Sequence, residues 1–275
     1  MNLSAAYIQM VKTFSPFLFL ILLLVGCKTN PPQQESLPIA TEDPMANIED
    51  SEAKELLEKA LESMGGLDAW NSIETLSFQK EFTLYKEDGA IEQSTLQGHT
   101  YQFIPETFIR IEWSQDDAEQ EITYDGAKVK KTINGTPDTR SSPSSIESAL
   151  FSSTFVASLP YNLLDEGVSL SYLGKDTLDT EQAVEVLQAV YDPNNHANHT
   201  TKDIWKLYFD QESYKLVGYM VQHADHYSYV INLNDTTVQG FTFVKDRESY
   251  RVDSLGNRLY LRADYSYSNY RLTQE

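Results

Sequence analysis

The sequence predicts a mainly β protein of the α+β class: a single strongly curved antiparallel sheet, an incomplete barrel, with helices covering its concave face. Three observations predict this fold. Aromatic residues make up 12% of the chain, and its 17 Tyr and 12 Phe favour sheet over a helical bundle. From residue 74 onward, apolar and polar residues alternate with a period of two in many short segments. Two helical segments, one before the first strand and one near residue 150, would cover the apolar face that a long antiparallel sheet must bury.

Composition excludes several classes of protein. The chain has 275 residues, of which 41% are hydrophobic and 23% charged, so most of it can build a core. Its 41 Asp and Glu outnumber 21 Lys and Arg, which gives a formal charge of −20. This balance argues against a nucleic-acid binder and against attachment to acidic lipid headgroups through a basic patch. With a single Cys, the chain has no internal disulfide and no Cys-based metal centre.

Residues 1–26 have the organisation of a bacterial export signal. The segment 17–25 is continuously apolar, and Lys12 is the only charged residue before it. The apolar run is too short for a spanning helix, which needs about 20 residues, but it suits the central region of a signal peptide. We therefore predict that residues 1–26 are a signal peptide.

The apolar run ends in Leu24-Val25-Gly26-Cys27, which resembles the bacterial lipobox. The only Cys of the chain stands at the one position where lipidation requires a thiol. Attached acyl chains contribute about 0.8 kcal/mol for each buried CH₂, so several chains would hold the protein on a membrane. We predict lipid attachment at Cys27 and contact with the membrane through it. The alternative is a soluble secreted protein with an incidental Cys.

The chain after the signal divides into two parts. Residues 27–50 are rich in Pro, Gln, Glu and Ser without a periodic pattern, which predicts a lipidated N-terminus followed by a disordered tether. Residues 51–275 are predicted to form one folded domain. It begins with a helix capped by Asp50 or Ser51 and ended by Gly65-Gly66, because Gly adopts the left-handed conformation of a helix end without steric cost.

Two groups of strands follow this helix. The first group begins at residue 74, where apolar residues start to alternate, and continues with segments near 91–103, 107–113, 119–124 and 128–133. A helix is predicted over 145–159, with a turn or second short helix after Pro160. The second group is expected near 168–173, 182–191, 203–209, 214–222, 227–233, 238–246 and 258–267. Short turns between successive strands indicate an antiparallel meander.

Three short motifs carry a resemblance to a known family. They are Met64-Gly65-Gly66-Leu67-Asp68-Ala69-Trp70, Leu159-Pro160-Tyr161-Asn162-Leu163-Leu164, and Leu207-Tyr208-Phe209-Asp210 running into Tyr214-Lys215-Leu216. In this order the chain resembles Bacteroidota lipoproteins with a LolA/LolB-like domain, the lipoprotein-carrier half-barrel, over about residues 50–275. The resemblance implies an apolar cavity that accepts acyl chains or another hydrophobic ligand, and it implies no catalytic residues. Together with the anchor it favours a bacterial cell envelope, and the outer membrane over the inner one.

Candidate cavity residues share the apolar faces of three predicted strands. We expect the ligand-binding surface to include Phe78, Lys80, Phe82, Ile109, Ile111, Trp113, Tyr265 and Tyr267. Lys80 interrupts the first apolar face and would meet an anionic headgroup at the rim, or extend its amine to water. The alternative for all these side chains is that they fill the core against the helices, since packed interiors leave few voids.

Four of the five histidines form two His-x-x-His pairs in polar segments, His196 with His199 and His223 with His226. If the strands 203–209 and 214–222 form a hairpin, its open end brings His199 and His223 to the same side. A shared metal site is then a geometric alternative to solvated loop histidines, which are the default interpretation, so no metal or cofactor is predicted.

The predicted function is binding of a hydrophobic or lipid ligand in an apolar cavity, without catalysis. No Gly-x-Ser-x-Gly elbow and no glycine-rich phosphate loop occurs in the sequence. Two alternatives stay open: a protein-interaction module of the envelope with a filled core, for which no partner is identified, and a metal-dependent hydrolase that uses the His pairs.

Overall fold

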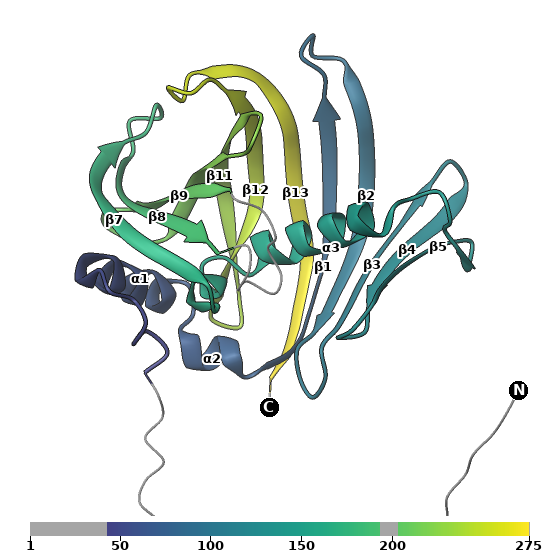
Figure 1. Ribbon diagram of the computed structural model, residues 1–275, viewed down its shortest axis with the longest axis horizontal. Coiled ribbons are helices and arrows are strands. Elements are labelled where there is room, and N and C mark those ends of the chain that lie inside the picture. The colour runs from purple at the N-terminus through teal and green to yellow at the C-terminus, as the bar shows by residue number, and fades with distance from the viewer. Residues whose placement is uncertain (1–42, 193–202, 275) are drawn as a thin grey trace, which may run out of the picture. The chain divides into compact units, whose positions relative to one another are not determined.

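A computed structural model describes residues 43–192 and 203–274. These residues form one 13-stranded antiparallel sheet that curves without closing into a barrel (Figure 1), which confirms the predicted fold class. The helices are α1 (Ser51–Ser63), α2 (Leu67–Asn71) and α3 (Pro143–Ala157), with a short 3-10 helix η1 at Tyr161–Leu164. The strands are β1 (Ile73–Tyr85), β2 (Ile91–Gln102), β3 (Phe108–Gln115), β4 (Ala118–Tyr124), β5 (Val129–Ile133), β6 (Thr136–Pro137), β7 (Val168–Thr177), β8 (Ala183–Tyr191), β9 (Ile204–Asp210), β10 (Leu216–Gln222), β11 (Tyr227–Val238), β12 (Phe241–Val252) and β13 (Arg258–Gln274).

The two groups of strands join through the first and the last strand. The order across the sheet is β6-β5-β4-β3-β2-β1-β13-β12-β11-β10-β9-β8-β7. Within each group, consecutive strands pair as neighbours, as the short turns predict. The pairing of β1 with β13, from Ile73 opposite Gln274 to Leu84 opposite Ala263, makes one continuous surface of the two meanders.

Helix α1 begins and ends as the sequence predicts. The Asp50 side chain accepts hydrogen bonds from the backbone N–H of Glu52 at 3.0 Å and of Ala53 at 3.1 Å. Gly65 follows the helix with a φ of +131°, and a side chain at this position would collide with Phe241. The same turn therefore ends α1 and seats it against β12.

The described chain starts a few residues before the predicted domain boundary at residue 51. Met45 is buried and packs with the apolar face of α1, and Lys54 forms an ion pair with Asp43 at 2.7 Å. The signal peptide, Cys27 and the tether up to residue 42 lie outside the described residues.

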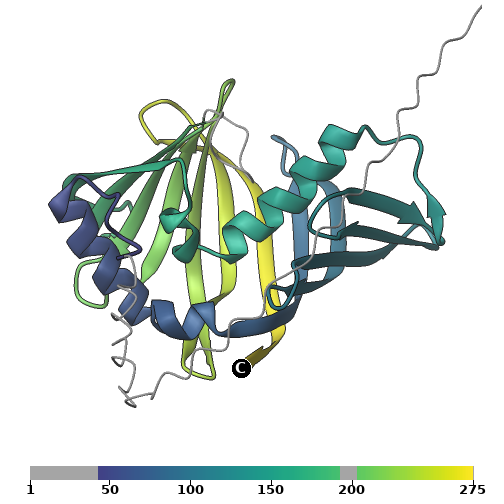
Figure 2. The same cartoon turned by 60° about the horizontal axis from the view of Figure 1, so that its bottom comes forward.

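Helix α3 covers the concave face of the sheet. It crosses the inner side of the curved strands in both views (Figures 1 and 2). Ser142 caps its first turn by accepting a hydrogen bond from the backbone N–H of Ser145, and Pro143 occupies the first helical position, where its missing N–H costs nothing. Leu150 of α3 is fully buried among residues of β1, β2 and β12. Among the described residues, no helix has the length and apolarity that crossing a membrane requires.

Buried side chains form three clusters. One joins α1 to β7–β10 and contains Leu57, Leu187 and Leu207, and a second joins α3 to β1, β2 and β12. The third cluster contains Tyr208, whose neighbour Leu207 belongs to the first cluster. Because neighbouring residues of a strand point to opposite faces, the third cluster lies on the other side of β8 and β9. Trp70 of α2 stacks on Tyr161 of η1, with 4.1 Å between the ring centres, and packs against the first two clusters.

The hairpin of β11 and β12 differs from the prediction. The sequence pattern predicts strands at 227–233 and 238–246, whereas β11 continues to Val238 and β12 runs from Phe241 to Val252. The turn falls on Gln239-Gly240, both with positive φ. Polar residues on the solvent side of both strands hide this long pairing from a pattern of apolar residues.

Candidate functional site

A cavity of about 320 Å³ lies between α3 and the concave face of the sheet. Its walls come from α3 and from β1, β2 and β9–β13, so strands from both meanders contribute. Apolar side chains form most of the surface, among them Phe155 and Val156 of α3 and Trp205, Val221 and Val230 of the strands. Cavities of this size and lining are typical of small-molecule sites.

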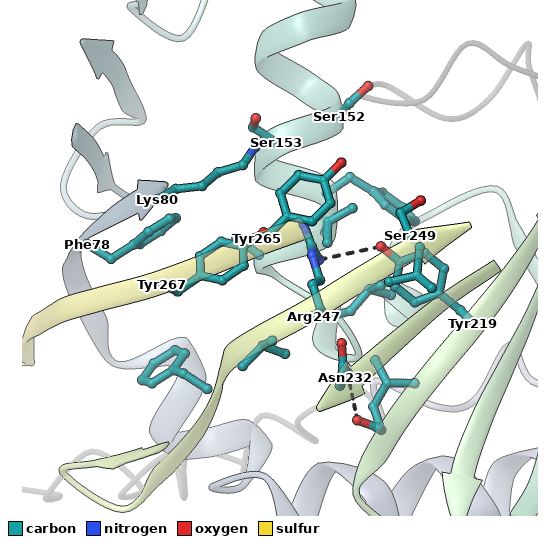
Figure 3. Close-up of a pocket in the computed structure, with 18 of the residues that line it drawn as sticks. Phe78, Lys80, Ser152, Ser153, Tyr219, Asn232, Arg247, Ser249, Tyr265 and Tyr267 are labelled. Carbon is teal, nitrogen blue, oxygen red and sulfur yellow. Dashed lines mark hydrogen bonds between the residues drawn. The ribbon is translucent and has the colours of Figure 1, made fainter. Parts of the chain in front are cut away.

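The Arg247 side chain is the central polar feature of the cavity. It comes from β12, is only 8% exposed, and lies among the rings of Tyr219, Tyr265 and Tyr267 (Figure 3). The centre of its guanidinium is 4.7 Å from the ring centre of Tyr265 and 5.0 Å from that of Tyr267. Its Nη1 donates to the Tyr219 hydroxyl over a long distance of 3.4 Å.

Within the described part of the chain, the Arg247 guanidinium has no acidic partner. Its Nε is buried without an acceptor, and no carboxylate of the described residues forms an ion pair with it. Burial lowers its pKa, the surrounding tyrosines raise it, and the balance is a raised pKa, so Arg247 keeps its charge. A buried charge without a counter-charge is costly, which marks this residue as unusual for a structural role.

Lys80 brings a second cation to the same cavity. Its side chain reaches from β1 into the hollow, and its Nζ lies 5.4 Å from the ring centre of Tyr265, the ring that Arg247 also contacts. Burial and, second, repulsion from Arg247 lower the pKa of Lys80 to about 7. Part of its surface stays accessible because it opens onto the cavity rather than onto packed atoms.

The other ionisable groups around these cations are neutral near pH 7. Burial raises the pKa of Tyr219, Tyr267 and Tyr270. Burial lowers the pKa of His99 to about 3, and its ring stacks on Phe78 with 4.8 Å between the ring centres. The cavity around the two cations therefore combines positive charge with apolar walls.

A carboxylate and a histidine occupy another part of the lining. His223 Nδ1 and Asp203 Oδ2 are 2.8 Å apart, and both residues line the cavity. The ring of His226 lies tilted by 32° against that of His223, with 4.3 Å between the ring centres, and His226 pairs with Asp225. Within residues 43–192 and 203–274, no three His, Cys, Asp or Glu side chains gather so that they could hold a metal ion. His196 and His199 lie outside the described residues, so the pairing of His199 with His223 stays a prediction.

The predicted cavity residues separate into two groups. Phe78 and Lys80 from β1 line the cavity together with Tyr265 and Tyr267 from β13, because the first and the last strand are neighbours in the sheet. Phe82 packs beside Tyr265, with 6.1 Å between the ring centres, and does not belong to the lining.

The remaining candidates lie on β3, away from this cavity. Ile109 is buried in the second cluster. Ile111 and Trp113 line a smaller hollow of about 240 Å³ beside the first half of α3, together with Ile122 and Lys131. Residues 109, 111 and 113 thus point to the same side of the sheet as the cavity residues of β1 and β13. They lie beside the first half of α3, whereas the cavity lies beside its second half.

Sequence reasoning missed Arg247, the most buried cation of the site. The reason is a register shift near residues 244–246, where β12 passes β11 irregularly. Such a bulge breaks the two-residue alternation from which inward-facing positions are identified. The charged stretch Lys245-Asp246-Arg247 also has the composition of a solvent-exposed segment.

Known structures share this fold. A LolA superfamily protein from Nitrosomonas europaea matches with a TM-score of 0.51 and 12% identity, over 81% of this chain and 94% of that one. A putative outer membrane lipoprotein-sorting protein domain from Vibrio parahaemolyticus matches with a TM-score of 0.50 and 8% identity, over 80% and 92%. Neither the protein-family models nor the curated proteins include a match to the sequence. The domain therefore has the LolA-like fold that the three sequence motifs suggest, while the bacterial group of the resemblance stays a prediction.

Proposed function

We propose that this protein is an exported lipoprotein of the bacterial envelope whose domain binds a hydrophobic or lipid ligand in the cavity under α3, without catalysis. The observation that carries the proposal is the cavity itself. A hollow of about 320 Å³ with largely apolar walls lies between α3 and the concave face of the sheet. An acyl chain is the kind of guest that such walls bind by burial alone.

The similar structures give independent support for this class of ligand. One is described as a member of the LolA superfamily and the other as a lipoprotein-sorting protein domain. Transferred to this chain, these descriptions suggest handling of lipid or lipid-modified protein in the cell envelope. Neither is described as an enzyme, which is consistent with binding without chemistry.

The anchor is a separate part of the proposal. The sequence Leu24-Val25-Gly26-Cys27 supports cleavage before Cys27 and lipidation of its thiol. A domain fastened in this way would work at a membrane surface, for which we favour the outer membrane. Residues between Cys27 and the first described residue, Asp43, would connect the domain to the lipid.

The two rival functions are less well supported. A protein-interaction module is expected to have a filled core, and the open cavity favours a ligand instead. A metal-dependent hydrolase would need ligands beyond His223 and His226, and the other candidate pair, His196 and His199, lies outside the described residues.

Binding of a neutral fluorescent probe, N-phenyl-1-naphthylamine, to the full chain tests the proposal. We expect saturable binding with one site per chain and strong loss in the variant Ser153→Trp. Ser153 lines the cavity from α3, so a Trp ring at this position would occupy the space of the guest.

The matched control is Ser148→Trp, on an exposed position of the same helix. We expect it to bind the probe like the unmodified chain. Thermal unfolding of both variants verifies that they are folded. Probe binding that is absent in the unmodified chain, or unchanged in folded Ser153→Trp, would contradict ligand binding in this cavity.

A further inference from the structure

We propose that Arg247 and Lys80 form an anion-binding subsite inside the cavity, for the head group of a single-chain amphiphile that carries a carboxylate or a phosphate monoester. The inference rests on the proposed function, because it assigns the chemistry of the guest in the same cavity. Three features support it: the missing counter-charge, the repulsion between the two cations and the size of the surrounding space.

The first observation is the missing counter-charge. Arg247 has five N–H donors, and the structure gives it one long hydrogen bond to Tyr219. Neither Arg247 nor Lys80 forms an ion pair with any residue in the described part of the chain. The chain as a whole carries 41 acidic residues, so a shortage of acidic residues does not explain why none of the described ones pairs with these two cations.

The second observation is the energetic imbalance that the two cations create. Contacts of Arg247 with the rings of Tyr265 and Tyr267 offset part of the cost of burying a guanidinium. They provide no anion, and Lys80 adds a second positive charge on the same Tyr265 ring. Two cations that line one apolar hollow repel each other, and an anion bound near both would relieve the repulsion and replace the lost hydration.

The carboxylate that the described lining does contain has another role. Asp203 lies within hydrogen-bonding distance of His223. The neighbours that influence the Arg247 charge are the phenols of Tyr219, Tyr265, Tyr267 and Tyr270. A carboxylate or phosphate group for the two cations is therefore expected to come from a guest molecule.

The third observation is the space beside the cations. Phe155, Val156, Trp205 and Val230 supply apolar walls in the same cavity. A volume of about 320 Å³ lies at the lower end of ligand sites, which suits one hydrocarbon chain better than a lipid with two or three chains. The geometry thus provides a place for one charged head and one chain.

Competition against N-phenyl-1-naphthylamine on the full chain at pH 7 tests the subsite. The competitors share one chain length and differ in the head: dodecanoate, dodecyl phosphate and dodecanol. We expect at least one anion to compete at a concentration about tenfold or more below that of dodecanol. The anion that competes better identifies carboxylate or phosphate as the preferred head.

The variant Arg247→Met keeps the length and apolar bulk of the side chain and removes its charge. We expect it to reduce the preference for the anion over dodecanol by about tenfold, as measured by the ratio of the two competing concentrations in the same variant. Arg247→Lys should keep part of the preference, because it keeps the charge without the planar fork. The matched control is Arg271→Met, on an exposed position of β13, and it should keep the full preference.

Two results would overturn the subsite. Equal competition by dodecanol and both anions in the unmodified chain, or a preference that persists in folded Arg247→Met, would show that the cations do not recognise the head; the cavity would still bind hydrophobic guests. Failure of the probe and of all three amphiphiles to bind would instead remove the proposed function, and the subsite with it.

Discussion

At the scale of single residues, the cavity contains charges that weaken the fold. Lys80 is surrounded by Phe82, Tyr265 and Arg247, and none of these offers it an anion. Residues of this kind lower the stability of the domain and are retained where they bind a ligand. Their effect on stability can be measured without knowing the ligand.

The variant Lys80→Met should stabilise the domain when no amphiphile is added. We expect the free energy of unfolding at pH 7 to rise by about 1–3 kcal/mol, because a desolvated charge is replaced by an apolar side chain of similar length and cavity water screens part of that charge. Urea unfolding measures this change. The control Lys245→Met, on an exposed position of β12, should change stability by less than about 0.5 kcal/mol.

The stabilisation by Lys80→Met should depend on pH in a defined direction. The pKa of Lys80 is about 7 in the folded domain and 10.5 in an unperturbed lysine, so between these values the unfolded chain holds a proton that the folded chain has lost. The Lys80 side chain therefore destabilises the fold most below pH 7. Between pH 7 and pH 10.5, the free energy by which it destabilises the fold changes with pH. The groups that face Lys80 are Arg247, which keeps its charge, the phenol of Tyr265, and His99, which is neutral at these pH values.

The sign of the change follows from proton binding. Stability rises with pH wherever the unfolded state binds more protons than the folded state, so the cost of Lys80 shrinks as pH rises from 7 toward 10.5. Within the range from pH 7 to pH 9, the advantage of Lys80→Met over the unmodified chain should consequently be largest at pH 7 and shrink toward pH 9. Parallel urea titrations at pH 7, 8 and 9 measure this trend. An advantage that stays constant over the three values, or grows, would show that Lys80 is not a desolvated cation in the folded domain.

At the scale of elements, one turn places α1 on the sheet. Gly65 ends the helix, and its φ of +131° is unfavourable for any side chain. A Cβ at this position would lie 2.5 Å from the Cδ1 atom of Phe241 and 3.1 Å from its Cα. Phe241 is itself buried at the start of β12, so a shift of its ring would disturb the packing around it.

The variant Gly65→Ala should therefore lower the free energy of unfolding by about 2–3 kcal/mol, through backbone strain together with a collision. Gly135 is the matched control, because it has a positive φ of +74° but a Cβ there would meet no neighbouring atom within 4 Å. Gly135→Ala should cost about 1 kcal/mol from strain alone. Equal losses in chemical denaturation would refute the contact between the turn and β12.

The elements that the sequence predicts well are those with strong local signals. The Asp50 cap and Gly65-Gly66 bound α1, and alternation identifies β1 through Leu76 and Phe78. The β11–β12 hairpin is placed incorrectly, because Gln239 provides no conventional turn signal and the bulge near Lys245 interrupts alternation. The same bulge hides Arg247, so the error in the element and the omission in the site have one cause.

Contacts between distant elements escape prediction from the sequence. Alternation shows that Phe78 and Tyr267 belong to apolar faces, and it places Ile111 and Trp113 on such a face equally well. Only the path of α3 across the sheet separates the first pair, which lines the main cavity, from the second pair, which lines the smaller hollow. A helix without one distinct apolar stripe gives no periodic signal for the strands that it will cover.

At the scale of the whole molecule, the sign of charge differs between the chain and its cavity. The chain carries a formal charge of −20, whereas the two charges that share contact with Tyr265 are positive. A net negative charge favours solubility of the domain in water. Solubility does not explain the two cations inside the cavity, Arg247 and Lys80. The proposed anionic ligand would explain them.

The proposed anchor gives a prediction at this scale as well. Cys27→Ser removes the only thiol of the chain, so it should abolish lipidation and leave uncleaved or soluble precursor. Fractionation of cells and intact-mass measurement detect both effects. Thr29→Ser, two residues further on, should behave like the unmodified chain, and membrane association that survives Cys27→Ser would disprove the anchor.

Binding of a hydrophobic guest in the cavity under α3 is the central claim, and native mass spectrometry of the full chain, purified from cells in a mild detergent, tests it most directly. We predict one amphiphile bound per chain, with a single hydrocarbon chain and an anionic head, and loss of this adduct in Ser153→Trp but not in Ser148→Trp. A folded chain that shows no adduct from the cell and acquires none when incubated with dodecanoate, dodecyl phosphate or dodecanol would contradict the claim.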